Sequence, residues 1–504
     1  MKNSLVALVI YFVNLVLNIF SRQVFIQYLG AEVLGLNTTA TSLLQFLNLA
    51  ELGIGTAIGC TLYKPLLDDD HQTINEIVSL QGWLYRRIAM VVIVGSAILM
   101  VFFPWIFNKM ELPLWYAYAS FGVLLFSSLL SYFINYKEIV LSANQEGYKI
   151  NYSYKSIILL KILVQIFAIK FLDNGYIAWL ILEVVFAIIA AMTLNYTIRK
   201  SFPYLVTDVR AGKALKHKYP DIVTKIKQLF FHKIGGFVLT QTSPIIIYSY
   251  ATLTLVAIYG NYMLIVMGLS ALLIAMFNGL AASVGNLVAE GEMKSIISVF
   301  RELYSSRFCI ISILSYGIYK LSPGFITLWV GESYILDNIS VLLIIAIFFI
   351  QTERETVISF LNAYGLFQDI WAPIAEASIN LGLSILLGYF FGLHGILVGI
   401  FLSLFFVIFL WKPYLLFSKG FKRSIKGYVT MYAKHLILLA VSILMTEYLF
   451  TIFPLQVINS ISTLIINCLI VITIFGLTLT LLLYIFEKGM KSFVHRILHI
   501  FIRK

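Results

Sequence analysis

Seven charged side chains stand out within the long apolar stretches of this chain, where water cannot solvate them. They are Arg22, Glu51, Lys161, Glu183, Glu353, Arg354 and Glu355. Because a charge within a bilayer costs about 3 kcal/mol or more, such residues usually face a polar cavity, bind an ion or ligand, or pair with one another. A carboxylate in this setting can hold a proton or a metal cation, and a guanidinium can hold a phosphate through two hydrogen bonds.

The carboxylate of Glu51 is the strongest of these candidates. At 1.5 Å per residue it lies about 21 Å from the expected outer end of its helix, past the middle of the bilayer. Its segment, residues 48–55, reads NLAELGIG, and the two glycines permit close packing or local unwinding. We therefore expect Glu51 to bind a coupling ion, either a proton or sodium. The alternative is a structural ion pair with Arg22 or Lys161.

Two of the cations have polar neighbours on their own helical face. Arg22 follows Asn14 and Asn18 at intervals of four residues, so we expect these groups to line a cavity in which Asn18 and Arg22 bind substrate. The alternative is that Arg22 extends to the outer interface. Lys161 lies one turn before Gln165, and we expect this pair to form a polar, substrate-binding wall. Extension of Lys161 toward the cytoplasm is equally compatible with its position.

Two further positions are expected to matter for substrate binding and movement. Arg354 lies between two glutamates, and successive helical residues point about 100° apart. We expect Arg354 to pair partly with one glutamate and to contact substrate; the alternative is an ion-pair cluster near a cytoplasmic gate. Pro244 is the expected hinge, because proline removes a helical hydrogen bond and such breaks often lie near transporter substrate sites. A simple structural kink is the alternative.

The motifs of known enzymes are missing from the sequence. It contains no Walker A, HExxH, CxxC or Gly-x-Ser-x-Gly pattern. We therefore expect no catalytic residue, no metal ligand and no enzymatic activity.

Membrane-spanning helices must position these candidate residues. Of the 504 residues 60% are hydrophobic and 12% are charged, whereas soluble domains carry about 25% charged residues. A spanning helix needs about 20 apolar residues. The apolar runs predict an all-α integral membrane protein with fourteen such helices, at residues 5–28, 37–63, 83–107, 114–140, 153–172, 175–198, 227–250, 254–286, 303–321, 336–363, 371–391, 394–416, 428–452 and 458–486.

Positive charge is concentrated on one side of these helices. The chain carries a net charge of +12, and about thirty of its 36 Lys and Arg residues lie at the two ends and in the even-numbered connections. Cytoplasmic loops are enriched in Lys and Arg, so both termini are expected in the cytoplasm. The same distribution explains the basic character without a nucleic-acid partner.

Two six-helix lobes are expected from the order of the helices. A basic linker, residues 199–226, separates an N-terminal lobe at 1–198 from a C-terminal lobe at 227–418, and residues 419–486 add two helices. A weak repeat supports parallel lobes: GTAIG at 55–59 and AASVG at 281–285 are each followed by a loop and by Ser and Tyr six residues apart. Such a repeat predicts a pseudo-two-fold axis along the membrane normal.

The C-terminal tail, residues 487–504, has the pattern of an amphipathic helix. Apolar side chains recur at helical spacing, at Met490, Phe493, Val494, Ile497, Leu498 and Phe501, and basic side chains fill the other face. We expect this helix to lie on the anionic lipids of the inner leaflet. Docking of a partner enzyme is the alternative.

The first 65 residues carry a recognisable motif. Residues 21–37 read SRQVFIQYLGAEVLGLN, and they are followed by LAELGIG at 49–55 and LYKPL at 62–66. This opening resembles that of bacterial polysaccharide flippases of the Wzx type. They belong to the multidrug/oligosaccharidyl-lipid/polysaccharide exporter superfamily, which also holds drug antiporters and the lipid II flippase. The remainder of the chain agrees in length, helix count and basic linker.

The resemblance implies both a fold and an activity. It implies two lobes around a central cavity, through which undecaprenyl-diphosphate-linked oligosaccharide repeat units cross a bacterial cytoplasmic membrane by alternating access for assembly of O-antigen, capsule or exopolysaccharide. No cofactor is implied beyond a coupling ion, and a polysaccharide polymerase or assembly proteins are candidate partners. The motif includes Arg22 and Glu51. It does not include Lys161 or Arg354, whose assignment to substrate binding depends on position alone.

Three alternative functions stay open. A cation-coupled drug antiporter would favour apolar and acidic cavity residues over basic ones. A lipid II flippase would be expected to carry more intramembrane cations than this chain has. A non-transporting scaffold for a polysaccharide assembly complex would use the basic tail as its docking site.

Overall fold

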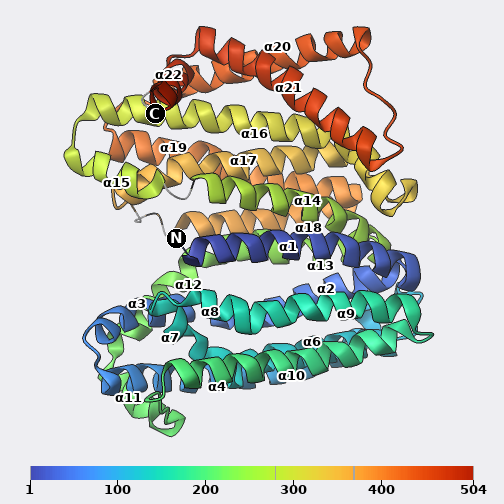
Figure 1. Ribbon diagram of the computed structural model, residues 1–504, viewed down its shortest axis with the longest axis vertical. Helices are drawn as coiled ribbons and strands as arrows, with labels where there is room; N and C mark the ends of the chain where they lie inside the picture. The colour runs from blue at the N-terminus through green and yellow to red at the C-terminus, as the bar shows by residue number, and fades with distance from the viewer. Residues whose placement is uncertain (1, 278–279, 367–368, 370, 503–504) are drawn as a thin grey trace. The chain divides into compact units, whose positions relative to one another are not determined.

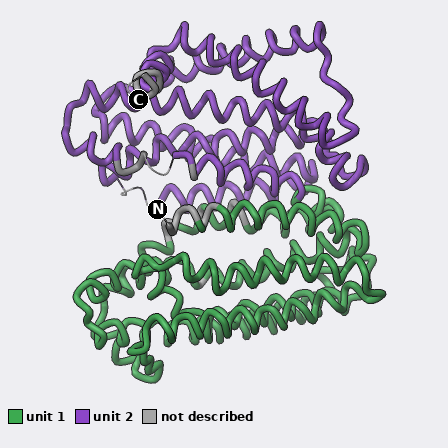
Figure 2. The backbone as a smooth tube through the Cα atoms, viewed as in Figure 1, with its two compact units in different colours: residues 1–260 green, residues 261–504 purple. Residues whose placement is uncertain are grey.

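The computed structural model describes residues 2–277, 280–366, 369 and 371–502, and these contain helices and no strand. The chain divides into two compact units, residues 1–260 and residues 261–504 (Figure 2). The predicted all-α fold is confirmed. The predicted lobe boundary at 199–226 differs from this division, which falls after Gly260 and leaves the helices that follow the linker in unit 1.

Unit 1 is a bundle of long apolar helices joined by short turns (Figure 1). Helix α10 lies against α9 and α6, α9 also contacts α1, and α6 also contacts α2 and α4. The helices are α1 (Lys2–Val24), α2 (Ala31–Leu47), α3 (Ile54–Leu67), α4 (His71–Val101), α5 (Phe103–Ile106), α6 (Trp115–Phe133), α7 (Glu138–Ala143), α8 (Gly147–Ile150), α9 (Ser156–Phe171), α10 (Gly175–Ser201), α11 (Gly212–Lys218), α12 (Pro220–Gln241), α13 (Ser243–Tyr250) and the beginning of α14 (Leu253–Phe277).

Unit 2 is organised around the long helix α16, which contacts α17, α21 and α22. Its core is aromatic: the ring of Phe300 on α16 packs edge-on against Phe360 and Phe421, with centroid distances of 5.3 Å. The helices are α15 (Leu280–Glu290), α16 (Met293–Val330), α17 (Asn338–Ala363), α18 (Trp371–Leu404), α19 (Lys412–Leu415), α20 (Lys426–Ile452), α21 (Ile461–Phe486) and α22 (Lys488–Ile502).

Each predicted span overlaps at least one helix of the described chain, and residues 278 and 279 of the span 254–286 lie outside the described residues. Nine segments of the described chain are long and apolar enough to cross a membrane. Five predicted spans account for the difference from fourteen. The regular helices α2 and α9 have only 17 and 16 residues, and α12 and α17 each carry three or more charged residues. The predicted spans 371–391 and 394–416 lie in one helical segment.

A sharp bend in α18 separates the last two of those spans. Gly392 has φ 56° and ψ −131°, a conformation that side chains disfavour. Beyond the bend the two arms of α18 pack so closely that a Cβ at Gly399 would lie 2.5 Å from the backbone nitrogen of Ser384. The apolar residues before and after Gly392 therefore form two successive helices, as predicted. A tight turn at Gly392 joins them.

The tail helix α22 packs on its own unit. Met490 is buried, and Phe493 and Val494 pack against a core cluster that α16 and α21 share. The guanidinium of Arg496 pairs with Glu302 of α16 at 2.9 Å. Over this stretch the apolar face is covered by protein, so a contact of the tail with inner-leaflet lipids stays a prediction for its remaining surface.

Candidate functional site

The strongest candidate site lies at a break between α2 and α3. A short 3₁₀ turn, Asn48–Glu51, follows α2, and Leu52 is extended with ψ 123°. Gly53 then has φ 92°, and α3 begins at Ile54. The local unwinding that the two glycines permit is therefore present, and it places Glu51 at the end of an interrupted helix, within unit 1.

Close packing of α12 explains why the break contains Gly53. A Cβ at this position would lie 2.9 Å from the Cβ of Leu229 and 3.1 Å from the carbonyl oxygen of Ile226. The backbone of α12 thus occupies the space of a side chain. Both the positive φ and this contact require glycine.

A tyrosine from α4 binds the Glu51 carboxylate. The hydroxyl of Tyr85 donates a hydrogen bond to Oε1 of Glu51 at 3.0 Å. Tyr85 is buried and packs edge-on against Tyr132 of α6, with 5.6 Å between ring centroids. One turn earlier, Asn48 donates to Ser128 at 3.1 Å. Three segments, the 3₁₀ turn, α4 and α6, therefore build a polar cluster around the carboxylate.

Glu51 lacks a cationic partner in the part of the chain that the structure describes. No salt bridge there includes it. Of the two partners in the alternative interpretation, Lys161 binds Glu183 instead, and no described salt bridge joins Glu51 to Arg22. The Tyr132 hydroxyl also lies close enough to interact with this carboxylate, so tyrosine hydroxyls, and no described cation, surround Glu51.

Lys161, Gln165 and Glu183 form a closed polar group between α9 and α10. The Lys161 Nζ lies 2.6 Å from Oε1 of Glu183, and Gln165 Nε2 donates to Oε2 at 3.0 Å. The side chains of Lys161 and Glu183 are 14% and 9% exposed. Lys161 and Gln165 thus lie together, as expected, but both side chains donate hydrogen bonds to the two carboxylate oxygens of Glu183. This geometry indicates a structural ion pair, and substrate binding by Lys161 and Gln165 stays a prediction.

Arg22 joins α1 to the beginning of α14. Its Nη2 donates to the carbonyl oxygen of Ala257 at 3.1 Å, and the side chain is half-buried. A Cβ at Gly260 would lie 2.6 Å from the same nitrogen, so the glycine makes room for the guanidinium. One turn before Arg22, Asn18 donates to the carbonyl oxygen of Asn14 at 2.8 Å.

Arg354 in unit 2 has two carboxylates nearby. Its Nε lies 3.4 Å from Glu355 and its Nη1 lies 4.0 Å from Glu376 of α18. Partial pairing with a neighbouring glutamate is therefore confirmed. Glu353 is 4% exposed and lines a small pocket that Arg354 and Tyr304 also line, but no described salt bridge joins it to Arg354. Substrate contact by Arg354 stays a prediction.

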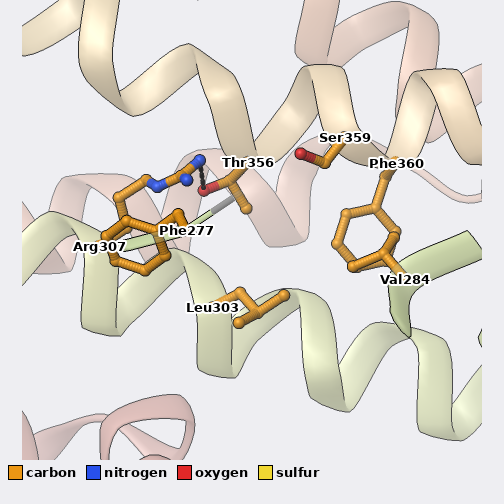
Figure 3. A pocket seen from close by; sticks show the side chains of 7 residues that line it. All are labelled: Phe277, Val284, Leu303, Arg307, Thr356, Ser359 and Phe360. Atoms are coloured by element: carbon orange, nitrogen blue, oxygen red, sulfur yellow. Dashed lines mark hydrogen bonds between the residues drawn. The ribbon is translucent and has the colours of Figure 1, made fainter. Parts of the chain in front are cut away.

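Among the ionisable residues of unit 2 that sequence reasoning missed, one lies near Arg354 and one lines a pocket. Glu376 and Arg307 both lie within predicted spans, so the criterion that selected the other intramembrane charges would have found them. Arg307 lines a pocket of about 20 Å³ with six other residues (Figure 3). It donates to Thr356 at 3.3 Å and stacks over the ring of Phe277 at 4.2 Å.

Pro244 lies in the first turn of α13, directly after the junction with α12. Proline is tolerated there because the first N–H groups of a helix have no intrahelical acceptor. The proline thus marks a boundary between two helices instead of a kink inside one. A hinge at this junction stays a prediction.

The comparisons with known proteins show the fold. No protein-family profile matches the chain, and no curated protein matches it in sequence. A multidrug resistance MATE family transporter of the MOP superfamily, solved in an inward-facing conformation, aligns over 79% of this chain and 94% of its own, with 13% identity and a TM-score of 0.59. The lipid II flippase MurJ, in an inward closed conformation, aligns over 95% of this chain and 98% of its own, with 14% identity and a TM-score of 0.63. The chain therefore has the all-α fold of MOP-type membrane transporters.

Replacing Gly53 with alanine should damage the Glu51 site. The positive φ costs an alanine about 1–2 kcal/mol, and its Cβ would collide with α12. We expect Gly53→Ala to lower the thermal midpoint of the purified protein by several degrees. Gly55→Ala is the matched control, because the nearest atom to its Cβ would be the Tyr85 hydroxyl at 3.7 Å. Equal midpoints for the two variants would contradict the close packing described above.

Breaking the Lys161–Glu183 pair should cost stability. Removal of one partner of a buried ion pair costs about 3 kcal/mol or more, whereas removal of both is often nearly neutral. We expect Lys161→Met to lower the thermal midpoint markedly, and Lys161→Met combined with Glu183→Leu to restore most of it. Lys170→Met, an exposed change on α9, should have little effect.

The same double variant separates a structural role from substrate binding. If Lys161 is only structural, the stable double variant keeps its transport activity. A double variant that is stable but inactive in transport would instead assign Lys161 to the substrate.

Proposed function

We propose that this protein is a flippase that moves undecaprenyl-diphosphate-linked oligosaccharide repeat units across a bacterial cytoplasmic membrane by alternating access. The observation that carries the proposal is the extent of the structural likeness. The fold of a lipid II flippase covers 95% of this chain, whereas that of a multidrug transporter covers 79%. A fold that accommodates a lipid-linked saccharide thus accounts for nearly the whole molecule.

The chemistry of such a substrate supports the same function. A diphosphate cannot enter hydrocarbon unaided, because burial of its charge is prohibitive. A guanidinium on the path offsets this cost, since Arg binds phosphate through two parallel hydrogen bonds. Arg22 is the candidate for this role, because it belongs to the segment that resembles Wzx-type flippases.

Glu51 is the candidate for energy coupling. It belongs to the same segment, lies at a helix break and has no described cationic partner. Binding of a proton or sodium ion there would neutralise the carboxylate and change its bond to Tyr85 of α4. Because α3 and α4 meet at this point, the state of one carboxylate would bias how the two helices pack.

Lipid II transport is the second candidate function. The likeness to MurJ favours it directly. We prefer the oligosaccharide substrate because the resemblance of residues 21–66 is to Wzx-type flippases. The two functions differ in the sugar and share the polyprenyl diphosphate.

Measurement of leaflet sidedness tests the proposed function. The purified protein is reconstituted into vesicles that carry either an undecaprenyl-diphosphate-linked oligosaccharide or lipid II, and the share exposed on each leaflet is followed in time. We expect rapid movement of the oligosaccharide lipid and slow movement of lipid II. Faster movement of lipid II would select the second candidate, and movement of neither would contradict a flippase.

In the same assay, the variant Arg22→Ala tests whether Arg22 binds the diphosphate. Loss of a charge-assisted hydrogen bond costs about 1.5–3 kcal/mol, so the rate should fall at least about tenfold. Arg87→Ala, which removes an exposed arginine from α4, should leave the rate within about twofold. A wild-type rate for Arg22→Ala would remove Arg22 from the substrate path.

A further inference from the structure

A cleft with a strongly basic lining lies in unit 1, where α4, α6 and α10 meet the linker that follows α10. Its volume is about 420 Å³. This cleft is here called the basic cleft, and the polar side chains that line it are Arg86, Tyr136, Lys137, Asn195, Arg199, Thr207, Asp208 and Arg210. None of them belongs to the sites of Glu51, Arg22 or Lys161.

Hydrogen bonds attach the linker, which forms one wall of the basic cleft, to α4. Asn75 donates to the carbonyl oxygen of Tyr204 at 3.0 Å and accepts from the backbone N–H of Val206 at 3.1 Å. Ser79 accepts from the backbone N–H of Asp208 at 2.9 Å. The wall is therefore a built part of the unit and not a loose loop.

Close packing holds the opposite side of the same wall. A Cβ at Gly82 of α4 would lie 3.0 Å from both the ring of Tyr136 and a methyl carbon of Val209. The Tyr136 hydroxyl also lies 3.3 Å from Thr207 Oγ1. The glycine thus lets the linker and the end of α6 approach α4, and this approach shapes the cleft.

Positive charge in the basic cleft is compensated only in part. Within the described residues, Arg86, Lys137, Arg199 and Arg210 form no salt bridge. The one carboxylate in the lining is Asp208, whose Oδ1 accepts the backbone N–H of Arg210 at 2.9 Å as the cap of a short helix. Four cations around one cavity repel one another, so a bound anion would stabilise the arrangement.

Position along the predicted spans sets the depth of the basic cleft. Arg86, Lys137 and Arg199 lie within three residues of the cytoplasmic ends of spans 83–107, 114–140 and 175–198. This is the level of the lipid head groups. Phe133 also lines the cleft and is 44% exposed, and Tyr196 on α10 is 68% exposed, as expected beside acyl chains.

We propose that the basic cleft binds the phosphate head group of a membrane lipid in the cytoplasmic leaflet. An anionic phospholipid and a polyprenyl diphosphate share this chemistry. The arginine and lysine side chains would donate hydrogen bonds to the phosphate oxygens. Asn195 and Thr207 add further polar groups to the wall of the cleft. Tyr136 packs against Tyr85 at 6.5 Å between ring centroids, so the basic cleft adjoins the Glu51 cluster. The inference is independent of the transport proposal, since a lipid can bind there whether or not the protein moves it.

Native mass spectrometry of the purified full chain tests the inference. The protein is mixed separately with phosphatidylglycerol, phosphatidylcholine and undecaprenyl diphosphate, and inorganic pyrophosphate is added as a soluble competitor. We expect selective retention of phosphatidylglycerol, undecaprenyl diphosphate or both, over phosphatidylcholine. Which of the two is retained identifies the source of the head group. Equal retention of phosphatidylcholine, or displacement of every lipid by dilute pyrophosphate, would overturn a lipid site.

Charge-neutral variants locate the binding. Lys137→Gln combined with Arg199→Gln should weaken retention at least about tenfold, equivalent to about 1.4 kcal/mol. Lys213→Gln combined with Lys216→Gln removes the same charge from the exposed face of α11 and should change retention less than about twofold. Arg86→Gln combined with Arg210→Gln is a second cleft variant, in case the first does not fold. Wild-type retention by a folded cleft variant, or an equal loss in the α11 variant, would overturn the proposal.

Discussion

Hydrocarbon does not solvate charge, and each ionisable group that this chain carries into the bilayer must therefore find its partners within the protein. The Lys161–Glu183–Gln165 group meets this requirement completely, because both carboxylate oxygens accept short hydrogen bonds. Glu51 meets this requirement with tyrosine hydroxyls alone, since Tyr85 donates to one oxygen, Tyr132 lies nearby and no described cation pairs with it. The same constraint thus separates a structural ion pair from a carboxylate that is available to an ion. It also explains why the candidate site coincides with a helix break, where backbone polar groups are free to line a cavity.

The helices and the break at Glu51 were predictable from the sequence, because apolar runs of about 20 residues and glycines act locally. The contacts that side chains make with neighbouring helices were not predictable in this way. Nothing in the spacing of Lys161 indicates that it meets Glu183, since that contact depends on how α9 packs on α10. Likewise, the pattern of α22 shows that one face needs an apolar partner, but not that α16 and α21 supply it for Met490.

The linker illustrates the same limit. Its charges were visible in the sequence, and they indicated only which side of the membrane it occupies. Asn75 and Ser79 on α4, which bind its backbone, look like ordinary polar residues of an exposed helical turn. Their role depends on the folded linker. The fold itself is shared by a multidrug transporter and a lipid II flippase, so the chemistry of individual side chains, and not the architecture, must decide what this protein carries.

The central claim is that the carboxylate of Glu51 couples an ion to the movement of a lipid-linked oligosaccharide. Its most direct test is the transport rate of Glu51→Gln in vesicles, measured with and without an imposed proton or sodium gradient. Glutamine preserves the shape of the side chain and the bond from Tyr85 but cannot ionise. The wild-type rate should fall when the gradient is removed, and the variant should be slow and insensitive to it. A variant that transports at the wild-type rate, with the same dependence on the gradient, would contradict the account.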